Sequence, residues 1–142
     1  MPSGPSLRQL HAHHAIHQGG LSGAIAKTQE MEDLLRAKEF EVARQAADHL
    51  VEYWETRVIS HADAEEDGFY REMLEQDPGL EEAIAKLTRD HDLLRIIAAD
   101  IKKMLKEEGL TYEVMQQFHA LLVVNEIHSR DEERLLLEEP SR

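Results

Sequence analysis

The sequence predicts an all-α fold, an antiparallel up-down-up-down bundle of four helices, from three observations. Helix-breaking residues are few, with seven glycines and four prolines among 142 residues. Good helix formers fill the segments between these breakers, and runs of β-branched residues are nearly absent. Apolar residues recur within the segments at steps of three, four and seven, which places them on one face of a helix. Short turns between such helices favour neighbours that run in opposite directions.

The first helix is expected to begin with a capping box formed by Ser6 and Gln9. Three glycines interrupt its apolar face, Gly19, Gly20 and Gly23. Each costs up to about 1 kcal/mol relative to alanine, so close packing or local distortion is expected there. A weak break near Lys38 ends this helix, and a second helix is expected over about residues 41–74.

A third helix is expected over about residues 80–107, because Pro78 precedes it and Gly109 follows it. Thr111 can cap a fourth helix, which extends to about residue 137. The four helices therefore divide into two helical hairpins, one on each side of Pro78.

Composition narrows the functions that such a bundle can have. A chain of 142 residues holds one hydrophobic core, so we expect one domain, residues 1–142, with the bundle over about residues 7–137. The formal net charge of −13 disfavours nucleic acid and membrane partners, because both require clusters of Lys and Arg. The lack of cysteine excludes disulfides, thiolate metal sites and cysteine nucleophiles. No signal-peptide core or long apolar run occurs, so a soluble cytoplasmic protein is expected, and no protein partner is indicated.

Nine histidines form an excess for a chain of this length, and histidine is the commonest metal ligand in proteins. Two of them open the matching hexapeptides HADAEE and HSRDEE. His61 and Glu65 are four residues apart, as are His128 and Glu132, so each pair lies on one helix face. Both members of the pair repeat at the same offset, 128 − 61 = 132 − 65 = 67. Because each pair continues an apolar face, its burial is costly unless a bound cation compensates the charge.

The other two helices are expected to supply further histidines to the same place. His91 lies among apolar residues of the third helix, and the first helix contains the stretch HAHHAIH. His14 follows apolar residues at the same spacing as His91, whereas His17 gives the first hairpin more even arms. Both alternatives stay open at this point. Alanine substitution of His11 or His13 is expected to leave metal binding nearly intact.

Imidazoles combined with carboxylates make a mixed nitrogen and oxygen site that suits two metal ions a few ångströms apart. Iron fits this ligand set best, although other divalent metals also fit, since all-oxygen ligation would favour magnesium or calcium and thiolates structural zinc. Glu66 and Glu133 lie beside the inner face and are expected to be surface charges or supports for the ligands. Without metal, Glu65 and Glu132 would face each other in an apolar interior, and we expect raised carboxyl pKa values.

On these residues the chain resembles the hemerythrin-like, HHE cation-binding family over most of its length. The matching features are His61-x-x-x-Glu65, His91 in LTRDHDLL, His128-x-x-x-Glu132 and a histidine of HAHHAIH. The resemblance implies a four-helix bundle with a non-heme di-iron centre, bridged by Glu65 and Glu132. The terminal ligands would be His61, His91, His128 and either His14 or His17.

The chain departs from the oxygen-carrying hemerythrins on two helices. Those proteins have His-x-x-x-His on helix three and His-x-x-x-x-Asp on helix four, and this chain has neither motif there. The pattern is more similar to bacterial and eukaryotic hemerythrin-like domains, whose roles include oxygen or iron sensing and responses to peroxide or nitric oxide. Simple reversible oxygen carriage is therefore not the expectation.

Three functions follow as hypotheses. The first is a protein with two carboxylate-bridged, non-heme iron ions that binds dioxygen or a related small oxidant for sensing, storage or detoxification. The second is a di-iron enzyme that acts on peroxide or another small substrate, which would need a substrate pocket and further acid–base groups. The third is a metal-free helical interaction module whose inward histidines and glutamates are hydrogen-bonded core residues.

Overall fold

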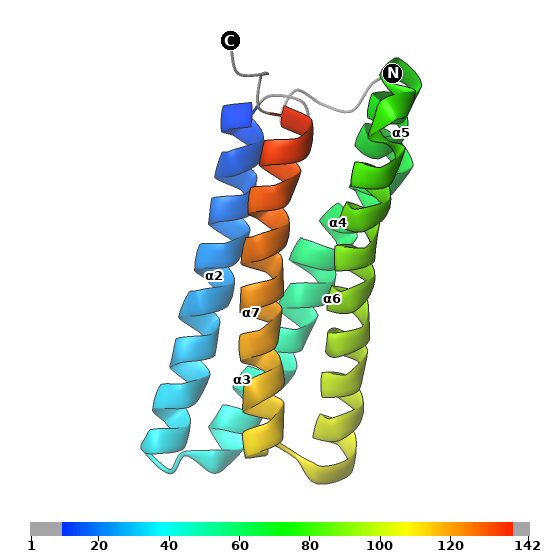
Figure 1. Cartoon of the computed structure of the whole chain (residues 1–142). Coiled ribbons are helices and arrows are strands. Elements are labelled where there is room, and N and C mark those ends of the chain that lie inside the picture. The colour runs from blue at the N-terminus through cyan, green and yellow to red at the C-terminus, as the bar shows by residue number, and fades with distance from the viewer. Residues whose placement is uncertain (1–9, 138–142) are drawn as a thin grey trace.

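Helices account for nearly all of the chain in the computed structural model, which describes residues 10–137 and the side chains from His13 onward. Four long helical segments lie side by side in this range, as Figure 1 shows. No strand occurs among the described residues. The prediction of an all-helical chain with four helices is therefore confirmed. The predicted capping box at Ser6 lies outside the described residues.

The first segment, α2, extends over Leu10–Arg36 as one uninterrupted helix in spite of its glycines. It ends where Lys38 adopts a left-handed backbone conformation, with φ of 62°. The amides of Lys38 and Glu39 donate to carbonyl groups of the last helical turn, at 3.0 and 2.9 Å. Such bonds satisfy carbonyls that would otherwise lack partners at a helix end. This turn leads into α3, Phe40–Tyr53, which packs against α2.

The second segment is continuous as far as Gln76 but contains two stretches of the wider π-helix. Its elements after α3 are η1 Trp54–Ile59, α4 Ser60–Ala64, η2 Glu65–Phe69 and α5 Tyr70–Gln76. A third π-helical stretch, η4 Glu133–Leu137, follows α7 and is the last described element. Such stretches are rare and frequently mark functional sites. One begins at Glu65 and another directly after Glu132, so each lies beside a glutamate of the two repeated pairs.

Local capping residues set the boundaries of the remaining elements. These elements are η3 Pro78–Leu80, α6 Glu81–Glu108 and α7 Tyr112–Glu132. Asp77 accepts a hydrogen bond from the amide of Gly79 at 2.9 Å, and Gly109 ends α6 with φ of 83°. Thr111 caps α7 by accepting a hydrogen bond from the amide of Val114 at 3.2 Å. The predicted cap and the predicted breaks are confirmed.

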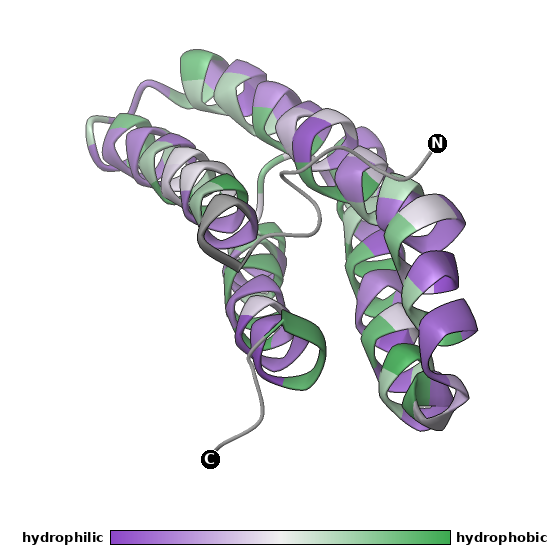
Figure 2. Ribbon diagram, turned by 90° about the horizontal axis from the view of Figure 1, so that it is seen from above, coloured by the Kyte–Doolittle hydropathy of each residue, from purple (hydrophilic) through white to green (hydrophobic). Residues whose placement is uncertain are grey.

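Two clusters of buried apolar side chains fill the interior. The larger includes Trp54, Leu94 and Phe118, and the smaller contains Phe69 and Leu87 with two neighbours. Hydrophobic and hydrophilic segments alternate along every helix in the view from above (Figure 2). In the second, third and fourth segments, the predicted metal-binding residues lie along the chain between a residue of the larger cluster and a residue of the smaller cluster. Among residues 10–137, no helix has the length and apolar character needed to span a lipid bilayer.

Candidate metal centre

A layer of polar side chains crosses the bundle between the two apolar clusters. Five of its members are buried, His13, Glu65, His91, His128 and Glu132. His17 and His61 lie at its edge, with side chains 11% and 22% exposed. We call these seven residues the metal-binding layer.

The layer consists of two overlapping groups, within each of which one potential ligand atom per residue lies within 4.8 Å of the others. The first group is His13, His17, His61 and Glu65, and the second is Glu65, His91, His128 and Glu132. Glu65 belongs to both groups. The layer therefore offers two adjoining positions for a cation that share one carboxylate.

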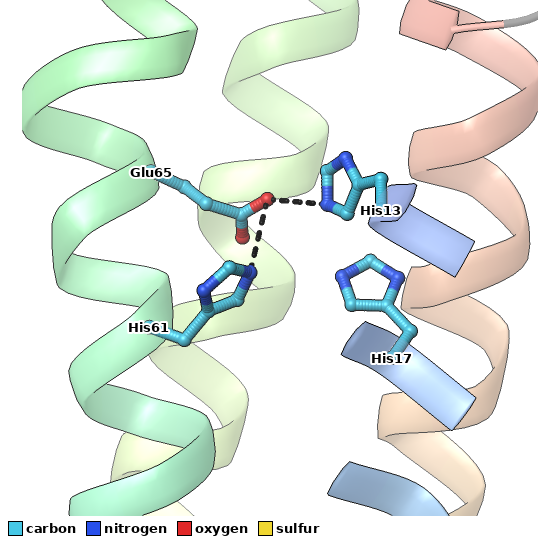
Figure 3. Close-up of side chains that lie close together, drawn as sticks. All are labelled: His13, His17, His61 and Glu65. Atoms are coloured by element: carbon cyan, nitrogen blue, oxygen red, sulfur yellow. Dashed lines mark ion pairs between the residues drawn. The ribbon is translucent and has the colours of Figure 1, made fainter. Parts of the chain in front are cut away.

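In the first group, the side chains of α2 face those of α4 and η2 across the interior (Figure 3). The Glu65 Oε2 atom lies 3.0 Å from Nε2 of His13 and 3.7 Å from Nε2 of His61. The ring of His17 lies between these helices too, with its centroid 4.3 Å from that of His13 and 5.8 Å from that of His61. Three imidazoles and one carboxylate thus face a common space.

In the second group, the Nε2 atoms of His91 and His128 face each other at 3.0 Å. Carboxylate oxygens approach both, since Glu65 Oε1 lies 3.4 Å from His91 Nε2 and Glu132 Oε2 lies 3.3 Å from His128 Nε2. Two ligands at right angles on one metal, each at about 2.1 Å, are about 3.0 Å apart. The separation of the two nitrogens therefore matches adjacent ligands of a single ion.

Carboxylates outside the layer orient the imidazoles of the second group. Nδ1 of His91 lies 2.7 Å from Oε2 of Glu66, and Nδ1 of His128 lies 3.0 Å from Oδ2 of Asp90. Arg95 holds Glu66 in turn, donating to the same Oε2 at 2.7 Å. A carboxylate on the far nitrogen fixes the tautomer of a ligand histidine and raises its basicity. Both Nε2 atoms are thereby left free to face a cation.

The first group lacks such support. Nδ1 of His13 and Nδ1 of His17 are buried and have no hydrogen-bond partner among the described residues. The two cation positions are therefore unequal, since only the His91 and His128 side is oriented by carboxylates.

Tyr70 contacts the layer from the smaller apolar cluster. Its hydroxyl donates a hydrogen bond to Oε2 of Glu132, and its ring is stacked on that of His91 with centroids 5.6 Å apart. Burial and the charges of Glu65 and Glu132 raise the pKa of Tyr70, so the phenol stays protonated and acts as a donor. Tyr70 thus fixes one oxygen of Glu132 and leaves the other facing the layer.

The polar atoms of the layer are poorly satisfied by one another. Seven buried side-chain nitrogen or oxygen atoms lack a hydrogen-bond partner in the described part of the chain, and six of them belong to the layer. Nε2 of His13 is 2.6 Å from Oε1 of Glu132, yet neither atom has hydrogen-bond geometry. Buried polar atoms without partners are costly. A cation in the layer would supply the missing partner, so this donor set fits a metal.

Without metal, protons take the place of the cation. Burial opposes the charge on His13, but the Glu132 and Glu65 carboxylates outweigh it and raise its pKa to about 9. The pKa of His128 is likewise raised to about 9, because Asp90 and Glu132 outweigh the effect of burial. Imidazolium groups thus neutralise the buried carboxylates.

The pKa shifts of the remaining groups follow from their surroundings. Burial lowers the pKa of His61, which keeps this imidazole neutral. For Glu132 the expectation of a raised pKa is wrong. Burial does raise it, but contacts with His128 and His13 hold it well below its usual value. The predicted like-charge repulsion is overcome by the histidines around the carboxylate.

The structure brings six of the seven predicted site residues into the layer, His17, His61, Glu65, His91, His128 and Glu132. His14 lies outside, because its side chain is 55% exposed and its Nδ1 contacts Oε1 of Glu133 at 2.9 Å. His13, which was expected to be dispensable, lies fully buried at the centre. Helical geometry gives the reason. His13 and His17 are four residues apart and share a face, whereas His14 is rotated by about 100° from His13.

The sequence does contain a signal for His13. His13-x-x-x-His17 repeats the four-residue step of the two His-x-x-x-Glu pairs. No comparable signal exists for Asp90, because its partner His128 lies on a different helix. Glu66 was expected as a surface charge or a support, and its contact with His91 makes it a support.

Comparison with protein-family models, with curated proteins and with solved structures gives no match to this chain. Its function must therefore be inferred from the residues themselves.

Proposed function

We propose that this protein is a non-heme di-iron protein of the hemerythrin-like kind, an antiparallel up-down-up-down bundle that binds dioxygen or a related small oxidant. The observation that carries the proposal is the sharing of Glu65 between two groups of potential ligands. A carboxylate between two adjoining cation positions is the arrangement that a bridged metal pair requires. Iron is the proposed metal because imidazoles and carboxylates together suit it.

The chain's own residues would divide the work of holding two ions. His13, His17 and His61 would serve one ion, His91 and His128 the other, with Glu65 and Glu132 near both. When bound, a pair of ferrous ions supplies electrons to a small oxidant. Asp90 and Glu66 would orient the imidazoles of the second group, and Tyr70 would hold Glu132. Apolar clusters flank the layer on either side, and five of its seven members are buried.

The unsatisfied atoms of the layer argue against a metal-free interaction module. Such a module requires core histidines and glutamates that satisfy one another by hydrogen bonding. Here six buried polar atoms of the layer have no such partner within the described chain. The third hypothesis is therefore disfavoured on physical grounds.

Iron analysis of anaerobically purified protein, with a visible spectrum after exposure to air, tests the proposal. We expect about two irons per chain and the charge-transfer bands of a bridged ferric pair. Protein that stays colourless and free of iron after reconstitution would overturn the proposal.

Two adjacent histidines provide a matched pair of variants for this experiment. His13→Ala removes a fully buried member of the layer, and its iron content should fall below that of wild type. His14→Ala removes its exposed neighbour and should retain two irons. An equal loss in both variants would argue against the assignment of the layer as the metal site.

A further inference from the structure

A cavity of about 240 Å³ adjoins the metal-binding layer on the side of the larger apolar cluster. It includes the space in which the two ions would lie, because five members of the layer line it together with apolar residues such as Leu94 and Val58. The five layer residues are His17, His61, Glu65, His91 and His128. One water molecule occupies roughly 30 Å³ of the liquid. The cavity spans several such volumes, so space is left beside the positions of the two ions and a diatomic oxidant.

A glycine keeps this space open. Gly20 lines the cavity, and a Cβ atom built on it would meet nothing within 4 Å. The Gly20 carbonyl accepts a hydrogen bond from the Tyr53 hydroxyl at 2.9 Å, which fixes this wall of the cavity. A glycine inside a helix lowers its stability by about 1 kcal/mol relative to alanine. A side chain at position 20 would fit without a clash, so the effect of the glycine is to leave the cavity volume unfilled.

A cation lies at the rim. Arg57, which also lines the cavity, is four residues before His61 and therefore lies on the same side of the helix. Its guanidinium carbon is 5.8 Å from the centroid of the Tyr53 ring, so one tyrosine positions both Arg57 and Gly20. No carboxylate of the described residues forms an ion pair with Arg57, although the chain carries a net charge of −13. An unneutralised guanidinium at the rim favours an anion.

A buried amide lies at the inner wall. Asn125 is three residues before His128 and only 7% exposed, and its side chain lines the cavity. Its amide makes no hydrogen bond with another described residue and is not among the fully buried atoms that lack one, so it is open to the cavity. A buried amide ordinarily has a partner, and here the cavity is the side from which one can come.

We propose that the cavity binds a small organic acid that has a hydroxyl or keto group at the other end of a short hydrocarbon chain. The carboxylate pairs with Arg57 at the rim, the hydrocarbon lies against Ile16, Val58 and Leu94, and the second polar group bonds Asn125. Binding of the acid does not require the proposed function. The inference rests on that function only where it makes the acid a substrate or effector of the metal centre.

Calorimetric titration with three probes tests the chemistry of the ligand in both metal-free and iron-loaded protein. The probes are 4-hydroxybutyrate, butyrate, which lacks the hydroxyl, and 4-hydroxybutyramide, which lacks the charge. We expect saturable binding of 4-hydroxybutyrate at one site per chain and at least about tenfold weaker binding of the uncharged amide. Equal binding of the charged and uncharged probes would overturn the proposal.

Adjacent glycines provide the matched variants for the position of the site. Gly20→Leu fills the cavity and should abolish binding, whereas Gly19→Leu, also with open space at its Cβ but exposed and outside the cavity, should not. Because Gly20→Leu could alter the helix, Arg57→Gln provides a second test on an exposed residue and should weaken 4-hydroxybutyrate about tenfold. Asn125→Leu should remove the preference for 4-hydroxybutyrate over butyrate.

The failure of this inference can be told apart from failure of the proposed function. Binding that needs iron and survives both Gly20→Leu and Arg57→Gln would show direct ligation of the acid to the metal, and would overturn the cavity proposal alone. In the opposite case, wild-type protein takes up no iron on reconstitution but still binds 4-hydroxybutyrate, and the Gly20→Leu and Arg57→Gln variants lose that binding. This result would support the cavity proposal and overturn the di-iron function.

Discussion

His91 and His128 face each other through their Nε2 atoms at 3.0 Å, while a carboxylate engages the Nδ1 atom of each ring. If both Nδ1 atoms carry their proton, two lone pairs meet in a buried space. That arrangement is unfavourable unless a proton or a metal lies between them. The pKa of His128 is raised to about 9, so in the metal-free protein a proton on His128 removes the unfavourable contact. A bound metal ion would remove it in the loaded protein. Several measurable consequences come from this competition and from the unequal support of the two cation positions.

Asp90→Asn should weaken one of two metal-binding phases. The charge of Asp90 raises the basicity of His128, and loss of such a support typically reduces metal affinity about 10- to 100-fold. Titration of the metal-free protein with cobalt(II), followed by visible absorption, should show two steps, of which the tighter shifts. Asp131→Asn, which removes a carboxylate that pairs with Arg134 at 3.5 Å, is the control and should leave both steps in place. Two identical steps in wild type would contradict the inequality of the positions.

Tyr70→Phe should destabilise the protein without emptying the site. The substitution keeps the ring stacked on His91 but removes the donor to the buried Glu132 carboxylate. Hydrogen bonds to charged groups contribute about 1.5–3 kcal/mol, so urea unfolding should show a loss in that range. Tyr112→Phe, at a side chain 78% exposed, should behave as wild type. If the Tyr70→Phe variant is as stable as wild type, the hydrogen bond from Tyr70 to Glu132 makes no net contribution to the free energy of unfolding.

The metal-free protein should lose stability as the pH rises from 6.5 to about 9. His13 and His128 have pKa values of about 9 in the fold against 6.5 for the unperturbed side chain. Their stabilisation is complete below pH 6.5 and disappears as pH rises through 9, at up to roughly 3 kcal/mol each. His61, whose pKa is lowered, acts in the opposite sense below pH 6.5. The lowered pKa of Glu132 adds stability above about pH 4.5 that acid removes.

Iron should reverse this trend, because metal ligands must be deprotonated before they bind. The melting temperature of the iron-loaded form should exceed that of the metal-free form increasingly from pH 6 to 9, and the difference should vanish near pH 5. Thermal unfolding of both forms across this range provides the measurement. His13→Gln should flatten the slope of the metal-free protein, since it removes one of the two titrating groups. A metal-free protein that gains stability between pH 6.5 and 9 would refute the account.

Two glycines of α2 should respond in opposite ways to alanine. A Cβ at Gly19 meets nothing within 4 Å, so Gly19→Ala should stabilise the protein by about 0.5–1 kcal/mol. A Cβ at Gly23 would overlap the hydroxyl of Tyr53, which is bonded to Gly20. Gly23→Ala should displace that hydroxyl and destabilise by about 1–3 kcal/mol. Chemical denaturation of both variants gives the sign of each change in the free energy of unfolding. Stabilisation by both substitutions would mean that Tyr53 moves aside at no cost.

Features determined within one helical turn could be predicted from the sequence. Thr111 has the side chain that a helix N-terminus prefers, and Gly109 readily adopts the positive φ that follows a helix. The His-x-x-x-Glu pairs are likewise local, because a four-residue step fixes a shared face regardless of the neighbouring helices.

Features that depend on how helices are rotated against one another could not be predicted. The choice between His13 and His14 is a rotation of about 100° about the axis of α2, which depends on the fit of its small residues against Tyr53. The contact between Asp90 and His128 depends on the alignment of α6 with α7. The π-helical stretches at Glu65 and after Glu132 have no sequence pattern that we can identify.

The turn at residues 77–79 divides the metal-binding layer unequally. All four members of the first group precede this turn, and the second group takes only Glu65 from that side. Contacts such as Glu65 with His91 and His13 with Glu132 therefore join the two halves of the chain, near the start of α2 and the end of α7. With metal in place, these direct contacts would be replaced by coordinate bonds from side chains of both halves to the ions, and the layer would cross-link the two halves. A pulling force that separates the two halves would then break the helix contacts at the ends of the bundle first, and separation would stop at the metal-binding layer.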